Sequence, residues 1–338
     1  MPCVLSCGLA ALSIPGVKRL AWRVGLVDRP DAGIHKSHQR PTPYGGGIAL
    51  ALATVLCAAL LPYPGASPAL FAILGGAFAL FVLGLADDWF TLPPLPRFAA
   101  QVAVACLLVY FYPECRLSVA DPGLAAALSV FWLVTMTNAL NFLDNMDGLS
   151  AGTAAVALLL LGALNLLAGH DQAAWLALIG LGALVGFLFF NFPPASIFMG
   201  DAGSFFIGFL ASALCLWTGT QATVAPHAPD HLYNALVPLV ALGVPAYDIA
   251  SVILIRLRRG AAPWHGDHNH ISHRLVRLGL SRRGAVVAIY ALALVAAGPV
   301  LLAGAGILPP GYALAACSAV LALVAASDFA LRRRSLAR

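Results

Sequence analysis

The sequence has 338 residues, of which 61% are hydrophobic and 10% are charged, and its formal net charge is +5. A mean hydropathy of +0.88 excludes an ordinary water-soluble domain and indicates an integral membrane protein. The sequence contains no internal repeat or low-complexity tract, so we predict one integral-membrane domain over residues 1–338, with no nucleic-acid partner.

Apolar runs of about 17 to 25 residues, the length that crosses a bilayer as a helix, recur along the whole chain. The predicted spans are 1–17, 45–62, 68–86, 98–113, 123–142, 152–169, 173–190, 202–219, 232–255, 285–302 and 308–331. The first is expected to be cut short by Pro15, followed by Lys18 and Arg19. The predicted fold class is therefore all-α integral membrane, a polytopic bundle of about 10 to 11 transmembrane helices.

The basic residues fall almost entirely in loops on one side of this predicted topology. If the loop 17–45 is cytoplasmic, all but Arg116 of the 19 Lys and Arg residues lie on the cytoplasmic side. Cytoplasmic loops carry such an excess in membrane proteins. We therefore predict a multi-pass protein of the bacterial inner membrane with its N-terminus outside and its C-terminus in the cytoplasm. The basic face suits anionic lipid headgroups and phosphate-bearing substrates.

Four polar islands interrupt the apolar chain, and each is predicted to lie at the cytoplasmic end of a span. They are the pair Asp87-Asp88 and the segments 138–147, 191–204 and 265–274. Ionisable groups are costly beside hydrocarbon and usually mark function. Their common depth predicts an active site on the cytoplasmic face.

The aspartates of the first and third islands have two contrasting settings. Asp87 and Asp88 end a predicted helix, where they oppose its dipole and repel each other, so a cation such as Mg²⁺ on a pyrophosphate is expected nearby. Asp201 lies in a Gly-flanked turn that opens a helix. It is suited either to capping that helix or to holding a metal ion while backbone N–H groups bind a phosphate.

The second island predicts a polar stripe. Asn138, Asn141 and Asp144 recur every third residue, so on a helix they lie along one side and lead to a loop containing Asp147. These side chains suit nucleobase edges, sugar hydroxyls and metal-bound water. Asn138 alone is also consistent with a polar contact between helices.

The fourth island is rich in histidine. The histidines from His265 to His273 are separated by three, two and three positions, and no cysteine accompanies them. Zinc is the alternative that this composition raises, but the spacing is irregular for a zinc site. Phosphate binding by the imidazoles and Arg274 fits the acidic islands better.

Together these segments resemble the polyprenyl-phosphate N-acetylhexosamine-1-phosphate transferases, relatives of the phospho-MurNAc-pentapeptide translocase. The resemblance covers residues 26–275: Val27-Asp28-Arg29-Pro30, then His38, the segment 41–47 and the four islands in family order. The segment 270–275 is similar to the UDP-GlcNAc branch. Two positions depart from the family pattern: Ile34-His35, where an Arg often precedes Lys36, and Asn145, which replaces a common Gly.

The resemblance implies transfer of HexNAc-1-phosphate, most closely GlcNAc-1-phosphate, from a UDP-sugar to undecaprenyl phosphate. UMP is released, and a lipid-linked cell-envelope glycan such as lipopolysaccharide is begun. It also implies Mg²⁺, with Mn²⁺ as an alternative, and a setting among membrane lipids; a homodimer and a covalent intermediate stay open. The implied residues are Asp87, Asp88 and Asp201 for catalysis, Asp88 and Asp201 for metal, and Asn141, Asp144, Asp147, Asn191, His270, His273 and Arg274 for substrate.

Three alternatives are weighed against this prediction. Phospho-MurNAc-pentapeptide transfer is a different reaction within the same family. A secondary transporter would carry its polar groups near the bilayer midplane rather than at helix ends. An intramembrane aspartyl protease is suggested by Tyr247-Asp248 and Gly200-Asp201, but the sequence context of Asp201 does not match. Asp248, inside its predicted span, is expected either to have a structural partner such as an asparagine or to take part in handling the lipid phosphate.

Overall fold

The computed structural model describes residues 1–28, 41–63, 65–220, 237–260, 262, 269–320 and 322. In these ranges the chain is mostly helical, and eight helices are long and apolar enough to cross a membrane. The predicted all-α polytopic membrane fold is confirmed. The predicted positions Arg29, Pro30, His38, His265 and His268 lie outside the described residues.

The helices follow one another along the described chain with short connections. The eight long helices are α1 (Pro2–Val24), α3 (Pro68–Phe90), α4 (Pro94–Phe111), α5 (Pro122–Leu143), α6 (Leu149–Ala168), α7 (Asp171–Asn191), α8 (Gly200–Thr220) and α12 (Arg282–Gly304). The shorter elements are α2 (Gly46–Leu60), the 3-10 turn η2 (Pro113–Cys115), α10 (Gly243–Arg258), α11 (Ile271–Arg277) and an apolar helix over Pro310–Val320.

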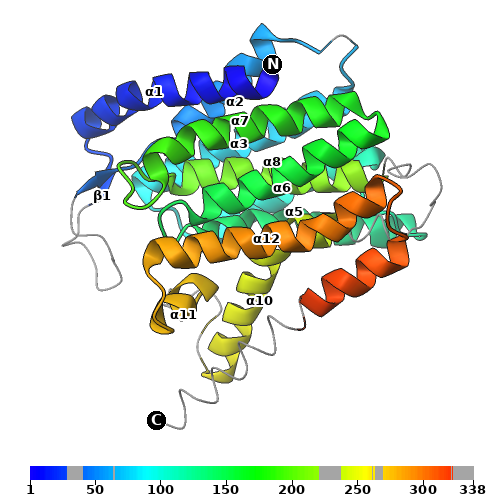
Figure 1. Cartoon of the computed structure of the whole chain (residues 1–338). Coiled ribbons are helices and arrows are strands. Elements are labelled where there is room, and N and C mark those ends of the chain that lie inside the picture. Colours follow the sequence, from blue (N-terminus) through cyan, green and yellow to red (C-terminus); the bar gives the residue numbers. More distant parts are fainter. Residues whose placement is uncertain are drawn as a thin grey trace.

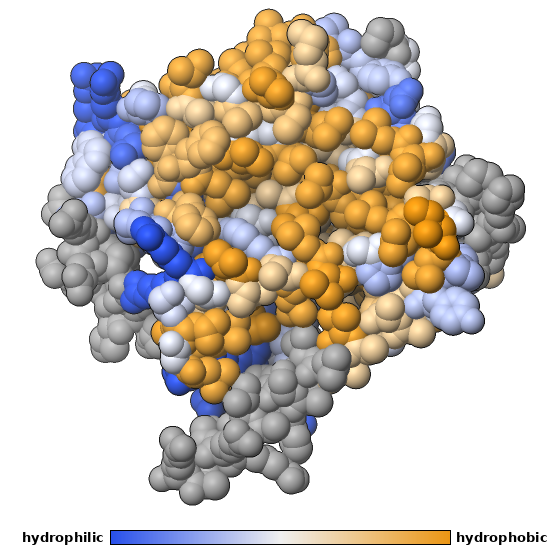
Figure 2. All heavy atoms as spheres, viewed as in Figure 1, coloured by the Kyte–Doolittle hydropathy of each residue, from blue (hydrophilic) through white to orange (hydrophobic). Residues whose placement is uncertain are grey.

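Helix α8 forms the centre of the bundle. The apolar window of α8 is completely buried, and α3, α5, α6 and α7 pack around it (Figure 1). A helix that is apolar on all sides needs such surroundings. Hydrophobic side chains also cover much of the outer surface (Figure 2); Phe71 and Phe131, for example, are 61% and 68% exposed. These flanks are suited to contact lipid.

Helix α1 is longer than predicted. It continues through Pro15 to Val24 instead of ending at residue 17. Proline removes one backbone hydrogen bond from a helix, but α1 packs backbone to backbone against α7, where a Cβ on Gly182 would lie 2.1 Å from the carbonyl oxygen of Cys3. This close packing depends on small residues and anchors the part of α1 before the proline. Beyond it Val17 and Ala21 are buried, and packing of this apolar face stabilises the last turns of the helix.

The predicted span 232–255 is interrupted. Residues 237–241 are helical, and α10 begins anew at Gly243 and continues to Arg258. Pro245 explains the break, because its ring excludes the carbonyl of Ala241, four residues earlier, from helical bonding. Helix α10 consequently crosses the direction of the other long helices and points away from the bundle (Figure 1).

A short two-stranded sheet closes one end of the bundle. Strand β1 (Val27–Asp28) pairs antiparallel with β2 (Thr42–Pro43), with Asp28 opposite Thr42. The chain after β2 bonds to the segment before α8, since Phe198 N–H donates to Pro43 O and Gly47 N–H donates to Met199 O, both at 2.9 Å. A Cβ on Gly47 would lie 2.3 Å from the nitrogen of Gly203. Glycine therefore allows α2 to start against the first turn of α8.

Candidate active site

A polar cavity of about 760 Å³ lies at this end of the bundle. It is formed where α3 and α5 end and where α4 and α8 begin, beside the β1–β2 sheet. Its polar lining consists of Asp28, Tyr44, Asp87, Asp88, Thr91, Arg97, Asn141, Asp144 and Asp201. The structure thus brings together Asp87, Asp88, Asp144 and Asp201 from the first three predicted islands.

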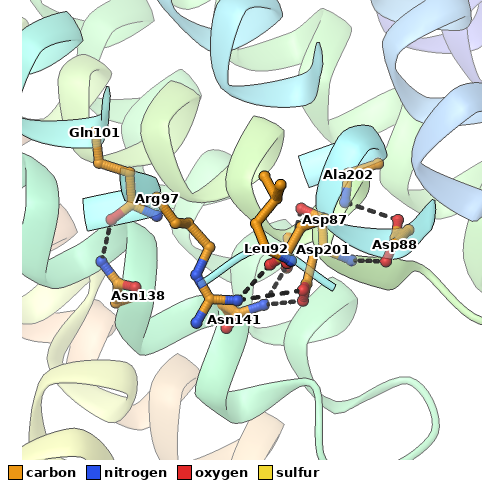
Figure 3. A network of polar contacts seen from close by, with 10 residues as sticks. Asp87, Asp88, Leu92, Arg97, Gln101, Asn138, Asn141, Asp201 and Ala202 are labelled. Carbon is orange, nitrogen blue, oxygen red and sulfur yellow. Dashed lines mark hydrogen bonds and ion pairs between the residues drawn. The ribbon is translucent and has the colours of Figure 1, made fainter. Parts of the chain in front are cut away.

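Asp87 is held by a cation from the next helix. Its Oδ1 accepts the Leu92 N–H at 2.8 Å, and its Oδ2 forms an ion pair with the guanidinium of Arg97. The same guanidinium nitrogen lies 3.8 Å from Oδ2 of Asp201 (Figure 3). Arg97 is therefore a cation of the kind expected beside the adjacent carboxylates.

Asp88 has a different task, which is to cap α8. Its two carboxylate oxygens accept the backbone N–H groups of Asp201 at 2.8 Å and Ala202 at 3.1 Å. The first N–H groups of a helix lack intrahelical partners and carry partial positive charge, so a carboxylate there is favourable. Asp88 provides this cap from a helix more than 100 residues earlier in the sequence.

Asp201 is consequently free of the capping role that its position suggested. Its Oδ1 accepts a hydrogen bond from Nδ2 of Asn141 at 2.6 Å, and its side chain is 33% exposed, on the cavity wall. Asn141 also donates to Ser204 Oγ at 2.9 Å. Asp201 therefore presents a carboxylate to whatever fills the cavity.

This arrangement depends on a close crossing of α3 and α8. A Cβ on Gly84 would lie 2.3 Å from the carbonyl oxygen of Asp201 and 2.6 Å from Cα of Ala202. Gly84 lies three and four residues before Asp87 and Asp88, so their side chains meet the start of α8 directly. Contact at this distance requires glycine.

The polar residues of the predicted stripe on α5 have two different roles. Asn138 donates to Gln101 Oε1 of α4 at 2.6 Å, so it makes the interhelical contact that was its alternative role. Asn141 and Asp144 reach the cavity. Burial raises the pKa of Asp144 well above its ordinary range, and neighbouring carboxylates, that of Asp201 first, raise it further. A cation in the cavity would counteract both effects.

Asp147 and Asn191 bind backbone groups beside the cavity. Asp147 Oδ2 accepts the Ala195 N–H at 2.9 Å. Asn191 accepts the Gly148 N–H and donates to Ile197 O, both at 2.9 Å, and is 2% exposed. These contacts join the α5–α6 and α7–α8 connections. Their predicted contact with substrate stays a prediction.

Helix α12 braces the same two connections. Tyr290 Oη donates to the carbonyl of Gly148, and Arg283 Nε donates to the carbonyl of Pro193 at 2.7 Å. Gly148 is thus held at its N–H by Asn191 and at its carbonyl by Tyr290. The brace fixes the loop that follows Asp144.

We expect Tyr290→Phe to lower activity by roughly 3- to 10-fold, below the 10²-fold typical of an ångström misplacement at a reacting centre. The lost hydrogen bond should cost about 1 kcal/mol of stability. Turnover and thermal midpoint are to be measured beside Tyr312→Phe, a matched change at a 68% exposed tyrosine. Equal turnover and equal thermal midpoints in the two variants would show that the Tyr290 hydrogen bond does not position the loop.

The described residues of the fourth island form a separate cluster at the start of α11. His270 Nδ1 lies 2.7 Å from Oδ2 of Asp248. Arg274 donates to Ser251 Oγ at 2.9 Å, and His273 lies beside His270, with ring centroids 6.5 Å apart. This cluster is not part of the cavity lining. It is joined to the cavity side by Ser272, whose hydroxyl donates to Asn145 Oδ1 at 2.7 Å.

Within the described ranges, no three His, Cys, Asp or Glu side chains come together as a metal site. The zinc alternative therefore finds no support among the described histidines. Asp248 and Asp201 also do not line one cavity, contrary to the arrangement that an aspartyl protease needs.

Three ionisable residues of the cavity lining were not predicted as site residues. Arg97 was counted only as a topological charge, although a lone cation soon after two aspartates is a usable signal. Asp28 and Tyr44 are brought together by the β1–β2 pairing. Burial raises the pKa of the Tyr44 phenol and Asp28 raises it further, so the hydroxyl stays protonated and donates to that carboxylate.

Comparison with known proteins is consistent with this site. The sequence profile of Glycosyl transferase family 4 matches residues 70–219, which include Asp87, Asp88, Asn141, Asp144 and Asp201. The chain is 35% identical over 284 residues to a probable undecaprenyl-phosphate N-acetylglucosaminyl 1-phosphate transferase of Bacillus subtilis. That alignment covers 82% of this chain and 76% of the relative.

Other relatives align over similar lengths. A decaprenyl-phosphate N-acetylglucosaminephosphotransferase of Mycolicibacterium smegmatis is 32% identical, covering 81% of this chain and 74% of the relative. An undecaprenyl-phosphate alpha-N-acetylglucosaminyl 1-phosphate transferase of Escherichia coli K12 is 27% identical, covering 80% and 75%. On identity and coverage of this extent, the chain belongs to the polyprenyl-phosphate N-acetylhexosamine-1-phosphate transferases of Glycosyl transferase family 4.

Proposed function

We propose that the protein transfers HexNAc-1-phosphate, specifically GlcNAc-1-phosphate, from a UDP-sugar to undecaprenyl phosphate and releases UMP. The observation that carries this proposal is the single cavity in which Asp87, Asp88, Asp144 and Asp201 meet Arg97. The names of three aligned relatives supply the sugar phosphate and the lipid acceptor.

The donor set of the cavity fits Mg²⁺. The ionisable groups that line it, apart from Tyr44 and Arg97, are carboxylates, and hard divalent cations prefer oxygen ligands. Mg²⁺ is usually held by one or two carboxylates together with substrate phosphates and water, which agrees with the lack of a three-ligand cluster among the described residues. We propose Asp201 and Asp88 as its ligands, because Asp88 lines the cavity and each of its oxygens accepts one backbone N–H, which leaves each a second lone pair. When bound, Mg²⁺ neutralises negative charge on the pyrophosphate oxygens.

The remaining residues orient the reaction. In the proposed transfer, a phosphate oxygen of the lipid attacks the β-phosphorus of the UDP-sugar, and the bond from that phosphorus to the oxygen of the leaving UMP breaks. Charge on the transferring group is stabilised by fixed cations and donors. Arg97 is such a cation, held in place by Asp87. His270, His273 and Arg274 are proposed to hold phosphate from the side of α11.

The distribution of charge supports a cytoplasmic position for the cavity in the bacterial inner membrane. Arg23 ends α1, Arg97 lies in the first turns of α4 and Arg283 begins α12 beside Pro193, all at the cavity end of their helices. A concentration of basic residues at one end of a bundle identifies the cytoplasmic end.

The proposal is tested with purified protein, Mg²⁺ and undecaprenyl phosphate, supplied in turn with UDP-GlcNAc, UDP-GalNAc or UDP-MurNAc-pentapeptide. We expect UMP release and a lipid-linked sugar product with UDP-GlcNAc, abolished by EDTA and restored by excess Mg²⁺. Turnover only with UDP-MurNAc-pentapeptide would move the protein to the other branch of the family. No UMP from any donor would overturn the proposed function.

A further inference from the structure

A buried carboxylate on α10 has no part in the reaction described above. Asp248 is 0% exposed, and both of its oxygens accept from the start of α11. Oδ2 lies 2.7 Å from His270 Nδ1, and Oδ1 accepts the Ile271 N–H at 2.7 Å. Among the described residues, the side-chain oxygens of Asp248 are therefore bonded to two consecutive residues.

This bonding defines the protonation of the imidazole. An ionised carboxylate only accepts hydrogen bonds, and a buried one needs donors for both oxygens. Nδ1 of His270 therefore carries its proton and donates it to Asp248. The choice of ring nitrogen in a histidine is commonly made by such a second partner.

Helix α10 fixes α11 at a second point. Ser251, one turn beyond Asp248, accepts from Arg274 at 2.9 Å, and the Arg274 guanidinium lies 5.8 Å from the ring centroid of Tyr247. Asp248 thus holds the first residues of α11, and Ser251 holds its middle. The orientation of this short helix is set by α10.

Helix α11 is in turn connected by a hydrogen bond to a loop of the cavity. Ser272 donates to Asn145 at 2.7 Å, and Asn145 directly follows Asp144, whose carboxyl lines the cavity. The contacts therefore form a continuous path from Asp248, through His270 and Ile271, to Ser272 and the loop of Asp144.

We propose that Asp248 is a positioning residue for donor binding. It sets the His270 tautomer, and it fixes α11 so that the α11 cluster and the loop of Asp144 are correctly placed to bind the nucleotide sugar. This inference rests on the proposed function. It separates Asp248 from the catalytic residues, since it touches neither the cavity nor the reacting groups.

The main test is Asp248→Ala, which removes both acceptors. We expect KM for UDP-GlcNAc to rise at least about 10-fold while kcat changes less than about 3-fold, the pattern of lost uniform binding. Asp248→Asn, which offers one acceptor oxygen for two donors, should fall between Asp248→Ala and wild type. In ¹⁵N-histidine spectra, the signal of the Nδ1-protonated His270 ring should be present in wild type and lost in Asp248→Ala.

A matched control separates positioning from general stability. Thr218→Val also removes a buried hydrogen bond, from Asn165 Nδ2 at 2.8 Å, but in the core of the bundle and away from the cavity lining. It should lower the thermal midpoint and leave KM and the histidine spectrum unchanged. If Asp248→Ala behaves in the same way, Asp248 is only structural and the inference is overturned.

Two further measurements keep the test decisive. If Asp248→Ala does not fold, Ser272→Ala breaks the link to Asn145 without touching Asp248, and a wild-type KM in that variant would also overturn the inference. If wild type releases no UMP, the proposed function fails. The ¹⁵N spectra then still report the Asp248–His270 pair, and an unchanged ring signal in Asp248→Asn and Asp248→Ala would refute it independently.

Discussion

Asp201→Asn is expected to reduce turnover at least about 10²-fold, the lower range for loss of a positioned catalytic group, while the thermal midpoint stays almost unchanged. The N–H groups of the α8 start are capped by Asp88, and the variant keeps its own backbone N–H. Its amide oxygen also still accepts from Asn141. What it loses is the negative charge that a hard cation requires, so any residual activity should need more Mg²⁺.

The control for this prediction is Asp121→Asn. Asp121 caps α5 with its own side chain, accepting the Leu124 N–H at 2.6 Å, at the opposite end of α5 from Asp144. Asn and Asp cap helices about equally well, so turnover and stability should match wild type. Turnover and Mg²⁺ titrations of both variants are the measurement. Wild-type turnover with an unchanged Mg²⁺ dependence in Asp201→Asn would place the metal elsewhere.

Gly84→Ala is expected to have the second large effect, although it adds a single methyl group outside the cavity. That methyl would lie 2.3 Å from the carbonyl oxygen of Asp201, so α3 and α8 must separate. Separation pulls Asp88 from the N–H groups that it caps and moves Asp87 relative to Asp201. We expect about a 10²-fold loss of activity, as for a 1 Å misplacement, and about 1–3 kcal/mol of destabilisation from overpacking.

Gly75→Ala on the same helix is the matched control, because a Cβ there would meet nothing within 4 Å. Alanine is also the better helix former, so this variant should retain full activity and stability. Turnover and thermal unfolding in detergent distinguish the two substitutions. Similar activity in both variants would show that the α3–α8 crossing does not control the site.

The sequence by itself determined the class of fold and the position of the site at the ends of helices. Helices that cross lipid must satisfy their backbone hydrogen bonds internally, so local composition reports them directly. Seven of the eleven predicted spans correspond to long helices to within a few residues at each end. The polar islands are equally local signals, and four of the cavity aspartates and Asn141 were identified from them.

Tertiary structure decided where helices end and what each carboxylate does. The helix α1 continues past Pro15 because Val17 and Ala21 beyond it are buried in the bundle, whereas the break at Leu242 follows from Pro245, a local feature of the sequence. Asp88 and Asp201 both line the cavity, yet Asp88 caps α8 from another helix and Asp201, at the start of α8, does not. Their tasks follow from a crossing of α3 and α8 between residues more than 100 positions apart. Such roles depend on interhelical distances of a few ångströms, which no local pattern of residues specifies.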